Sequence, residues 1–318
     1  MPGGPPTKSV GWLLQQLPVT AACVLRAGRV VAGVGDVSRP VGIHSVRKSI
    51  ASALVGQAWD RGDVVLDMTL ADLDIDDAPP LTDPEKSATV ADLLTARSGV
   101  YLPVEGGEFV GRPARKSHPP GTFWYYNNWD FNVVGHVFER LTGRSIYVAF
   151  DHDLASPLGM ADWNIYEHGA YHYRADILGA TARYPNYSIQ LSARDLALLG
   201  QLYLQHGRWA GREVLSRKWV EQSTQGHCRT DRTPGLLGMY GYCWWVAGPD
   251  ADLEYAPALA GSYSAVGFGG SFLTVLPKLD AVVAVVVDTE SPPACALANS
   301  LTEDSYAAFV VELSASLT

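Results

Sequence analysis

The sequence predicts an α+β fold, in which strands from both ends of the chain form an antiparallel sheet flanked by helices. Near the N-terminus, residues 22–34 have the pattern of a β-hairpin that turns at Ala27 and Gly28. Near the C-terminus, residues 272–276 and 281–287 form a second pair of strands. The middle of the chain has helical segments separated by long loops, so we expect a mostly helical insertion between the two halves of the sheet.

Residues 45–62 open the helical part. Apolar residues recur there at helical spacing, and Gly62 stands where a C-terminal cap belongs. Further helices are expected at 89–96, 128–141 and 193–205. Glycines follow the last two, as helix stops should. The apolar residues of the first helix are Val46, Ile50, Leu54 and Ala58, the two stop glycines are Gly143 and Gly207, and the long loops are residues 102–122 and 164–188.

The strand at 281–287 is apolar on both faces, which is typical of a central strand covered on both sides. A final helix begins at about residue 302. Its apolar stripe consists of Tyr306, Phe309, Val310 and Leu313.

These elements predict two domains. Residues 1–65 and 190–318 form a discontinuous sheet domain, and residues 66–189 form the mostly helical inserted domain. We expect the active site in the cleft between them.

The composition argues against several classes of partner. A chain of 318 residues with 47% hydrophobic side chains can bury a substantial core. A net charge of −9 and a pI near 5.3 disfavour nucleic acid and anionic membranes as partners. The first twenty residues lack the pattern of a signal peptide, and no apolar run reaches membrane-spanning length, so we expect a cytoplasmic protein.

No metal or other cofactor is expected. The cysteines lack Cys-x-x-Cys spacing and are predicted to be buried thiols. The acidic run at residues 72–76 fails as a calcium loop, because Asp77 and Asp83 stand where glycine and glutamate are needed. Gly169 lies between His168 and His172 and argues against a helical zinc pair. The four cysteines are Cys23, Cys228, Cys243 and Cys295.

The most informative motif is Ser45 followed three residues later by Lys48. Residues three apart on a helix share a face, so the lysine can reach the serine hydroxyl. A desolvated lysine, or one beside another positive charge, becomes a base, and a tyrosine can complete the proton relay. Tyr126 and Asn128 supply a Tyr-x-Asn downstream. An ordinary N-cap serine with a solvated lysine would give the same first motif, so the surrounding sequence has to decide.

Ordered motifs along the chain resemble those of the class C β-lactamase and penicillin-binding-protein superfamily, in the branch with esterases and 6-aminohexanoate-dimer hydrolases. The resemblance implies a β-lactamase/transpeptidase-like fold and acyl-enzyme chemistry. The similar segments are residues 45–49, 93–99, 126–131 with Gly135, 192–197 and 240–245.

The resemblance also favours Tyr126 over Tyr125 as the relay residue. Only that register places an aromatic residue, Phe131, five positions later and a glycine, Gly135, nine later. For the other tyrosine and for the tryptophans, core packing is the commoner role. The residues that form a possible cleft wall are Tyr125, Trp124, Trp129 and Trp245, with Trp163 and Trp244 as further aromatic candidates.

Residues 268–271 depart from the family pattern. Penicillin-recognising members usually carry Lys-Thr-Gly there, or a histidine for the lysine, and the cation helps to hold a substrate carboxylate. This chain has no cation at that place. An N–H from this segment could pair with the N–H of Ser45 as the oxyanion hole, although glycines needed only for packing are the alternative. The four residues are Phe268, Gly269, Gly270 and Ser271.

We therefore expect a serine hydrolase that acts on a small ester or amide without an obligatory carboxylate. Ser45 is the nucleophile, Lys48 and Tyr126 carry its proton, and Asn128 orients lysine or substrate. An acyltransferase that passes the acyl group to an amine or alcohol uses the same residues and stays open. A non-catalytic ligand-binding or sensor module is the third alternative. The sequence leaves the oligomeric state open.

Overall fold

A computed structural model describes residues 8–103, 111–172, 183–232, 235–249, 253–292 and 300–317. The strands are β1 (Ala21–Arg26), β2 (Arg29–Gly35), β3 (Val41–Gly42), β4 (Gly169–His172), β5 (Asn186–Leu191), β6 (Arg208–Trp209), β7 (Arg212–Glu213), β8 (Cys228–Arg229), β9 (Met239–Tyr240), β10 (Trp245–Val246), β11 (Tyr263–Gly267), β12 (Ser271–Leu276) and β13 (Ala281–Val286).

The α-helices are α1 (Val10–Gln15), α2 (Arg47–Asp60), α3 (Asp83–Lys86), α4 (Val90–Leu94), α5 (Asn128–Thr142), α6 (Ile146–Phe150), α7 (Ser156–Leu158), α8 (Ile165–His168), α9 (Ala193–Leu204), α10 (Arg217–Ser223) and α11 (Glu303–Leu317). Shorter helical turns are η1 (His44–Val46), the π-turn η2 (Asp151–Ala155), η4 (Pro257–Leu259) and η5 (Pro277–Leu279).

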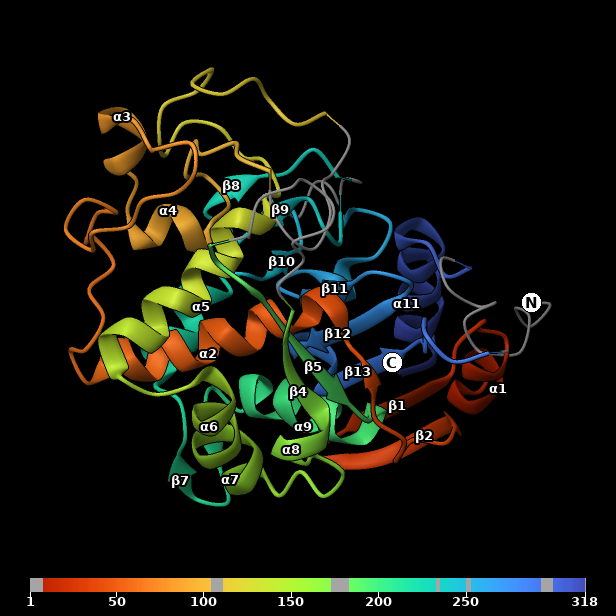
Figure 1. Cartoon of the computed structure of the whole chain (residues 1–318). Coiled ribbons are helices and arrows are strands. Elements are labelled where there is room, and N and C mark those ends of the chain that lie inside the picture. Colours follow the sequence, from red (N-terminus) through yellow and green to blue (C-terminus); the bar gives the residue numbers. More distant parts are fainter. Residues whose placement is uncertain are drawn as a thin grey trace.

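The main sheet joins the two ends of the chain, which confirms the predicted α+β fold (Figure 1). Within the described residues its order is β2-β1-β13-β12-β11-β10-β9-β8, and each of these neighbours pairs antiparallel. Both predicted hairpins are present. The outer strands β8, β9 and β10 have two residues each, too few for an alternating pattern to be recognised in the sequence.

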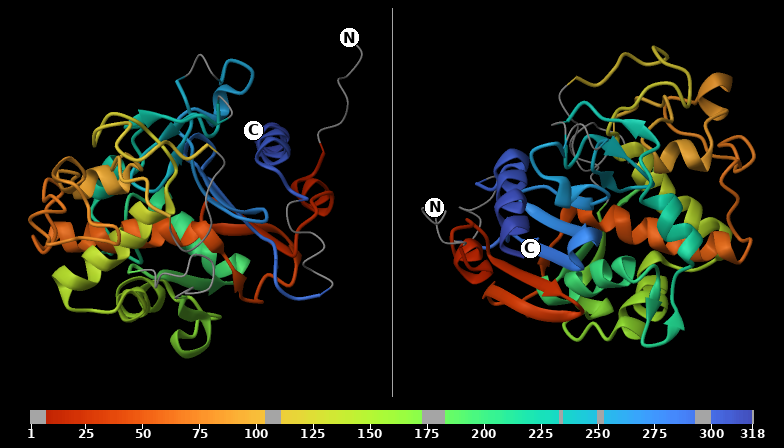
Figure 2. Two further views of the ribbon diagram at one scale, coloured as in Figure 1. Left: turned by 45° about the horizontal axis from the view of Figure 1, so that its top comes forward. Right: turned by 180° about the vertical axis from the view of Figure 1, so that it is seen from behind.

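Helices cover the two faces of the sheet (Figure 2). Tyr306 of α11 stacks on Phe272 of β12 with ring centroids 3.9 Å apart. The next residue, Leu273, points to the opposite face, where α9 lies so close that a Cβ on Gly200 would be 2.8 Å from Leu273 Cδ1. Every residue of β13 is buried, as predicted for a central strand covered on both sides.

The predicted helices in the middle of the chain are present, with ends shifted by a few residues. The prediction of a loop over 164–188 was wrong in its described parts, which hold α8, β4 and the start of β5. β4 pairs with β5, and β5 pairs with β3, so residues 41–42, 169–172 and 186–191 share a small sheet. β4 has only four residues and begins with a glycine, so its sequence lacks a recognisable strand pattern. Of the other predicted loop, residues 104–110 lie outside the described part, and 111–122 contain no helix or strand.

Helix α2 runs through the middle of the molecule and positions the site (Figure 1). It packs against α5, α6 and α10, so its polar N-terminal residues are enclosed together with its apolar ones. The predicted helix start at Ser45 is the short turn η1, which leads directly into α2. Gly62 adopts the left-handed conformation expected after a helix end, with φ +80°.

The described cysteines are unpaired. Cys23 and Cys243 are buried and Cys228 is half-buried, while Cys295 lies outside the described residues. Burial raises the pKa of the Cys23 and Cys228 thiols to about 11. No group of three metal-ligating side chains occurs in the described ranges, and the side chain of His172 lies outside them. Likewise, no helix in the described ranges is long and apolar enough to cross a membrane.

Candidate active site

Ser45, Lys48, Tyr126 and Asn128 meet at the N-terminal end of α2. Lys48 Nζ lies 2.9 Å from Ser45 Oγ, 2.7 Å from the Tyr126 hydroxyl and 2.6 Å from Asn128 Oδ1. An ammonium group has three donors for these three oxygens, whereas a neutral amine keeps a lone pair that can accept the serine proton. The serine hydroxyl therefore lies beside the lysine in both protonation states, and only the neutral amine can act as its base.

The environment of Lys48 favours the neutral amine. Its side chain is 1% exposed. Burial and the neighbouring charge of Arg47 hold the pKa of Lys48 well below its ordinary value, while Cys243 and Asp130 act weakly in the opposite direction. The rings of Tyr126 and Phe131 lie 4.1 and 4.4 Å from Nζ and favour the ammonium form through cation–π attraction. Desolvation of a charge costs several kcal/mol and outweighs that attraction.

Tyr126 stays a phenol in this site. Burial raises its pKa, and a hydrogen bond with Ser45 opposes that shift only in part. With the lysine neutral and the tyrosine protonated, Lys48 is the stronger base next to Ser45. Tyr126 can then pass a proton between Lys48 and a leaving group.

Asn128 is held by the start of α5. The Asn127 side chain caps this helix by accepting a hydrogen bond from the Trp129 N–H at 3.2 Å, so Asn128 is the first helical residue and faces Lys48. Asn127 Nδ2 also donates to Val100 O and to Asp130 Oδ1. These bonds fix the backbone that carries both Tyr126 and Asn128.

A buried carboxyl group supports the same backbone. Asp130 accepts hydrogen bonds from the Ser98 hydroxyl at 2.6 Å and from the Ser98 N–H at 3.3 Å. Burial raises the pKa of Asp130 well above its ordinary value, and the Ser98 bonds oppose that shift. In the sequence, Ser98 belongs to one of the segments that resemble the family motifs, but its hydrogen bond with Asp130 was not predicted.

Aromatic side chains surround the Tyr126 ring. Trp245 stacks on it with ring centroids 5.4 Å apart, and the Trp124 ring lies 6.4 Å away. These two of the four candidate cleft-wall residues therefore adjoin the site. Phe131 and Tyr240 complete the group at 4.9 and 6.1 Å.

The other aromatic candidates lie elsewhere. Tyr125 is buried against Tyr101, and Trp129 is buried with its indole N–H donating to Asp77 at 2.7 Å. Trp163 donates to Asp151 and packs on Phe150. Trp244 is enclosed between Tyr203 and Tyr263. These four side chains have the packing role that is commoner for buried aromatics.

Residues 268–270 form the turn between β11 and β12, and Ser271 is the first residue of β12. The Phe268 ring is 62% exposed and stands edge-on to His44 at 5.6 Å, next to Ser45. A Cβ on Gly267 would be 2.4 Å from Ile43 O, so the end of β11 lies against the backbone that leads into Ser45. Gly269 and Gly270 have φ of +81° and +106°, which strongly favours glycine.

Ser271 is turned toward the sheet. Its hydroxyl accepts a hydrogen bond from Val287 N at 3.2 Å, and the side chain is fully buried. The Ser271 side chain therefore stabilises the sheet and does not face the site.

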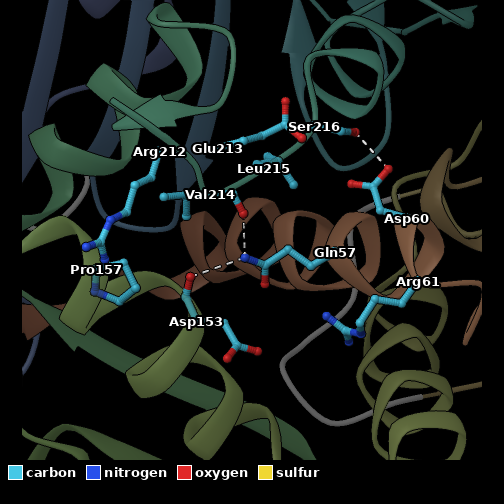
Figure 3. A pocket seen from close by; sticks show the side chains of 10 residues that line it. All are labelled: Gln57, Asp60, Arg61, Asp153, Pro157, Arg212, Glu213, Val214, Leu215 and Ser216. Carbon is cyan, nitrogen blue, oxygen red and sulfur yellow. Dashed lines mark hydrogen bonds between the residues drawn. The ribbon is translucent and has the colours of Figure 1, made fainter. Parts of the chain in front are cut away.

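The structure also has a groove of about 420 Å³ at the opposite end of α2 (Figure 3). Gln57 lies at its centre and donates to Val214 O and Asp153 O. Gln57 is nine residues beyond Lys48, roughly 13 Å along the helix. The groove is therefore separate from the serine and lysine.

Comparison with known proteins identifies the family of the chain. The family model described as Beta-lactamase matches residues 13–307. The chain belongs to the beta-lactamase family. This membership confirms the resemblance inferred from the motifs.

Relatives within the beta-lactamase family include enzymes and penicillin-binding proteins. A 6-aminohexanoate-dimer hydrolase of Paenarthrobacter ureafaciens is 27% identical over 266 residues, which cover 80% of this chain and 62% of that protein. The chain thus spans only 62% of the length of this curated relative.

Two solved structures show how widely the fold is shared. An octameric penicillin-binding protein homologue from Pyrococcus abyssi has a TM-score of 0.63 at 19% identity, covering 94% of this chain and 74% of that one. A penicillin-binding protein from Bacillus halodurans has a TM-score of 0.63 at 17% identity, covering 90% and 95%. At these identities the likeness concerns the fold.

Sequence reasoning missed three residues that lie around Lys48 and Tyr126. Phe131 served only to set the motif register, and Tyr240 was only part of a matching segment. Arg47 lies within the serine–lysine motif, but the sequence analysis gave it no role. The available signal for Arg47 was a charge just before a run of small and apolar residues, 49–56, in the predicted helix.

Proposed function

We propose that the chain is a serine hydrolase that forms an acyl-enzyme on Ser45 and acts on a small ester or amide. The observation that carries the proposal is the buried Lys48 amine within hydrogen-bond distance of Ser45, Tyr126 and Asn128. An amine that is desolvated and adjoins a serine hydroxyl is the arrangement that activates such a nucleophile.

In the proposed reaction, Lys48 takes the proton of Ser45 as Oγ attacks the carbonyl carbon. The carbonyl oxygen becomes an oxyanion, for which we propose the N–H of Ser45 and one N–H of residues 268–271 as donors. The close approach of Gly267 to Ile43 supports this pairing of backbone segments. Collapse of the intermediate expels the leaving group, which receives a proton by way of Tyr126. Water then repeats the sequence and releases the acid.

We further propose that substrate enters between the sheet domain, residues 1–65 and 190–318, and the inserted domain, residues 66–189. Ser45 and Lys48 come from the first part, and Tyr126 and Asn128 from the second. The aromatic rings of Trp124 and Trp245 beside Tyr126 suit a partly apolar acyl group.

The substrate class follows from two observations. Residues 268–271 contain no cation for a carboxylate. The Paenarthrobacter relative is named a 6-aminohexanoate-dimer hydrolase, and a dimer of that amino acid is a linear amide. We therefore propose esters and linear amides, ahead of β-lactams, as substrates.

Turnover of p-nitrophenyl esters and p-nitroanilides of short acids tests the proposal, with Ser45→Ala as the control. Hydrolysis predicts that p-nitrophenol and free acid form in equal amounts, also when an amine or alcohol is added. Acyl transfer to the added acceptor in preference to water would replace the hydrolase with an acyltransferase. A wild-type rate no higher than that of Ser45→Ala would contradict both.

A further inference from the structure

Arg47, the residue before Lys48, is a buried arginine at the start of α2. Its side chain is 4% exposed. One guanidinium nitrogen, Nη2, donates to Asn132 Oδ1 of α5 at 3.1 Å. The guanidinium carbon lies 4.7 Å from the centre of the Tyr187 ring of β5.

This charge has no counter-ion in the described part of the chain. No carboxylate there comes within ion-pair distance of Arg47, and its Nε is buried without a hydrogen-bond partner. An enclosed charge with unsatisfied donors is costly, because water would have solvated it and a neutral amide and an aromatic ring do so only in part.

The position within the helix adds a second cost. Arg47 is the first residue of α2, and the first turn of this helix contains no acidic residue. The N-terminal end of a helix carries partial positive charge, so a cation there is disfavoured. An apolar side chain of similar length would avoid both costs, so the packing of the fold does not account for the charge.

Lys48 is the buried titratable side chain that follows this charge in the helix. The two residues are consecutive, both are almost fully buried, and water that would screen them is largely excluded. A second positive charge on Lys48 would therefore be repelled. The titratable or charged groups that face this pair are His44 of η1, Tyr126 before α5, Asp130 of α5, Tyr187 of β5 and Cys243 between β9 and β10.

We propose that Arg47 is a positioning residue whose uncompensated charge repels a proton from Lys48 and so keeps this base ready for the proton of Ser45. The inference rests on the proposed acyl-enzyme function. Among the described residues, Arg47 makes no hydrogen bond to Ser45 or Lys48. Its proposed effect on the reaction is therefore electrostatic and acts through the protonation of Lys48. The direction is consistent with the low pKa of Lys48, to which burial contributes most and Arg47 next.

The test is the pH dependence of the acylation burst with a p-nitrophenyl ester for wild type, Arg47→Gln, Arg47→Met and Arg47→Lys. Removal of the charge in the Gln and Met variants should move the acid limb of the profile to higher pH by about one unit. Arg47→Lys places an amine in the same enclosed site, where burial favours loss of its proton, so its limb should lie between those of wild type and Arg47→Gln. Arg61→Gln is the matched control, because Arg61 lies at the other end of α2, about 21 Å away, exposed and paired with Asp63.

A second readout makes the result independent of catalysis. Lysine ¹³Cε NMR in a Ser45→Ala background gives the titration midpoint of Lys48, assigned by comparison with Lys48→Met. Arg47→Gln should raise that midpoint by about one pH unit. An unchanged midpoint, or a rate that falls with an unchanged acid limb, would overturn the proposal and leave Arg47 a packing residue. Failure of the wild type to acylate, with the midpoint shift present, would count against the hydrolase proposal alone.

Discussion

The Lys48 amine lies 2.7 Å from the Tyr126 hydroxyl, and both groups are buried. Their pKa values are displaced in opposite directions, downward for Lys48 and upward for Tyr126, mainly by burial. Both shifts favour an electrically neutral pair, with the proton on tyrosine. In the proposed reaction, this distribution suits Lys48 as the proton acceptor for Ser45 and Tyr126 as the proton donor.

Tyr126→Phe tests the donor role. The ring and its stacking on Trp245 are kept, so the fold should persist, while the hydroxyl that bonds Lys48 is lost. We expect acylation to slow by about 10²–10⁴-fold, the usual contribution of a positioned acid or base. Stopped-flow release of p-nitrophenol measures this rate. Tyr125→Phe is the control and should keep most of it, whereas equal losses in the two variants would remove Tyr126 from the relay.

Asn128→Asp tests the electrostatics of the base. A carboxylate 2.6 Å from Lys48 Nζ favours the ammonium form and raises the pKa of Lys48. Because the reaction needs the neutral amine, the acid limb of the pH–rate profile should move upward by about one pH unit or more. Asn128→Ala removes the same hydrogen bond without a charge and should not raise the limb in this way. If the Asp and Ala profiles coincide, Lys48 is not the titrating base.

Asp130 predicts a pH dependence of stability. Its folded-state pKa is raised by burial, so the folded chain holds a proton that the unfolded chain releases near pH 4. Its contribution to the free energy of unfolding is complete below that pH and is lost as the pH rises through the folded pKa. Asp130→Asn does not titrate there. Urea unfolding at pH 5 and pH 8 should therefore show wild type losing stability relative to the variant, and a difference that is equal at both values would refute the assignment.

Gly200→Ala tests the packing of α9 on the sheet. A Cβ at this position would lie 2.5 Å from Val282 Cγ1 and 2.8 Å from Leu273 Cδ1, which forces the helix and sheet apart. We expect a loss of about 1–3 kcal/mol in the free energy of unfolding. Gly11→Ala in α1 is the control, since nothing lies within 4 Å of its Cβ, and it should cause no loss. Chemical denaturation measures both changes.

The sequence predicted the parts of this molecule that depend on local pattern. The hairpin at residues 22–34 and the buried strand at 281–287 follow from alternation and from an unbroken apolar run. The spacing of Ser45 and Lys48 follows from helix geometry. The resemblance to a known family supplied the Tyr126 register, and the structure has this hydroxyl beside Lys48.

Features that depend on tertiary packing were beyond the sequence. Two-residue strands such as β9 exist only because longer neighbours pair with them. The side chain of Trp129 turns toward Asp77 and that of Ser271 toward Val287, and no local pattern specifies either direction. The enclosure of Arg47 depends on α5 and β5, which are far away in the sequence.

The most direct test of the account is intact-protein mass spectrometry after exposure to a fluorophosphonate, followed by peptide mapping, for wild type and Ser45→Ala. If Ser45 is the nucleophile, one adduct forms on wild type, located on Ser45, and none forms on the variant. An unmodified wild type, or equal labelling of Ser45→Ala, would contradict the assignment of Ser45 as the nucleophile.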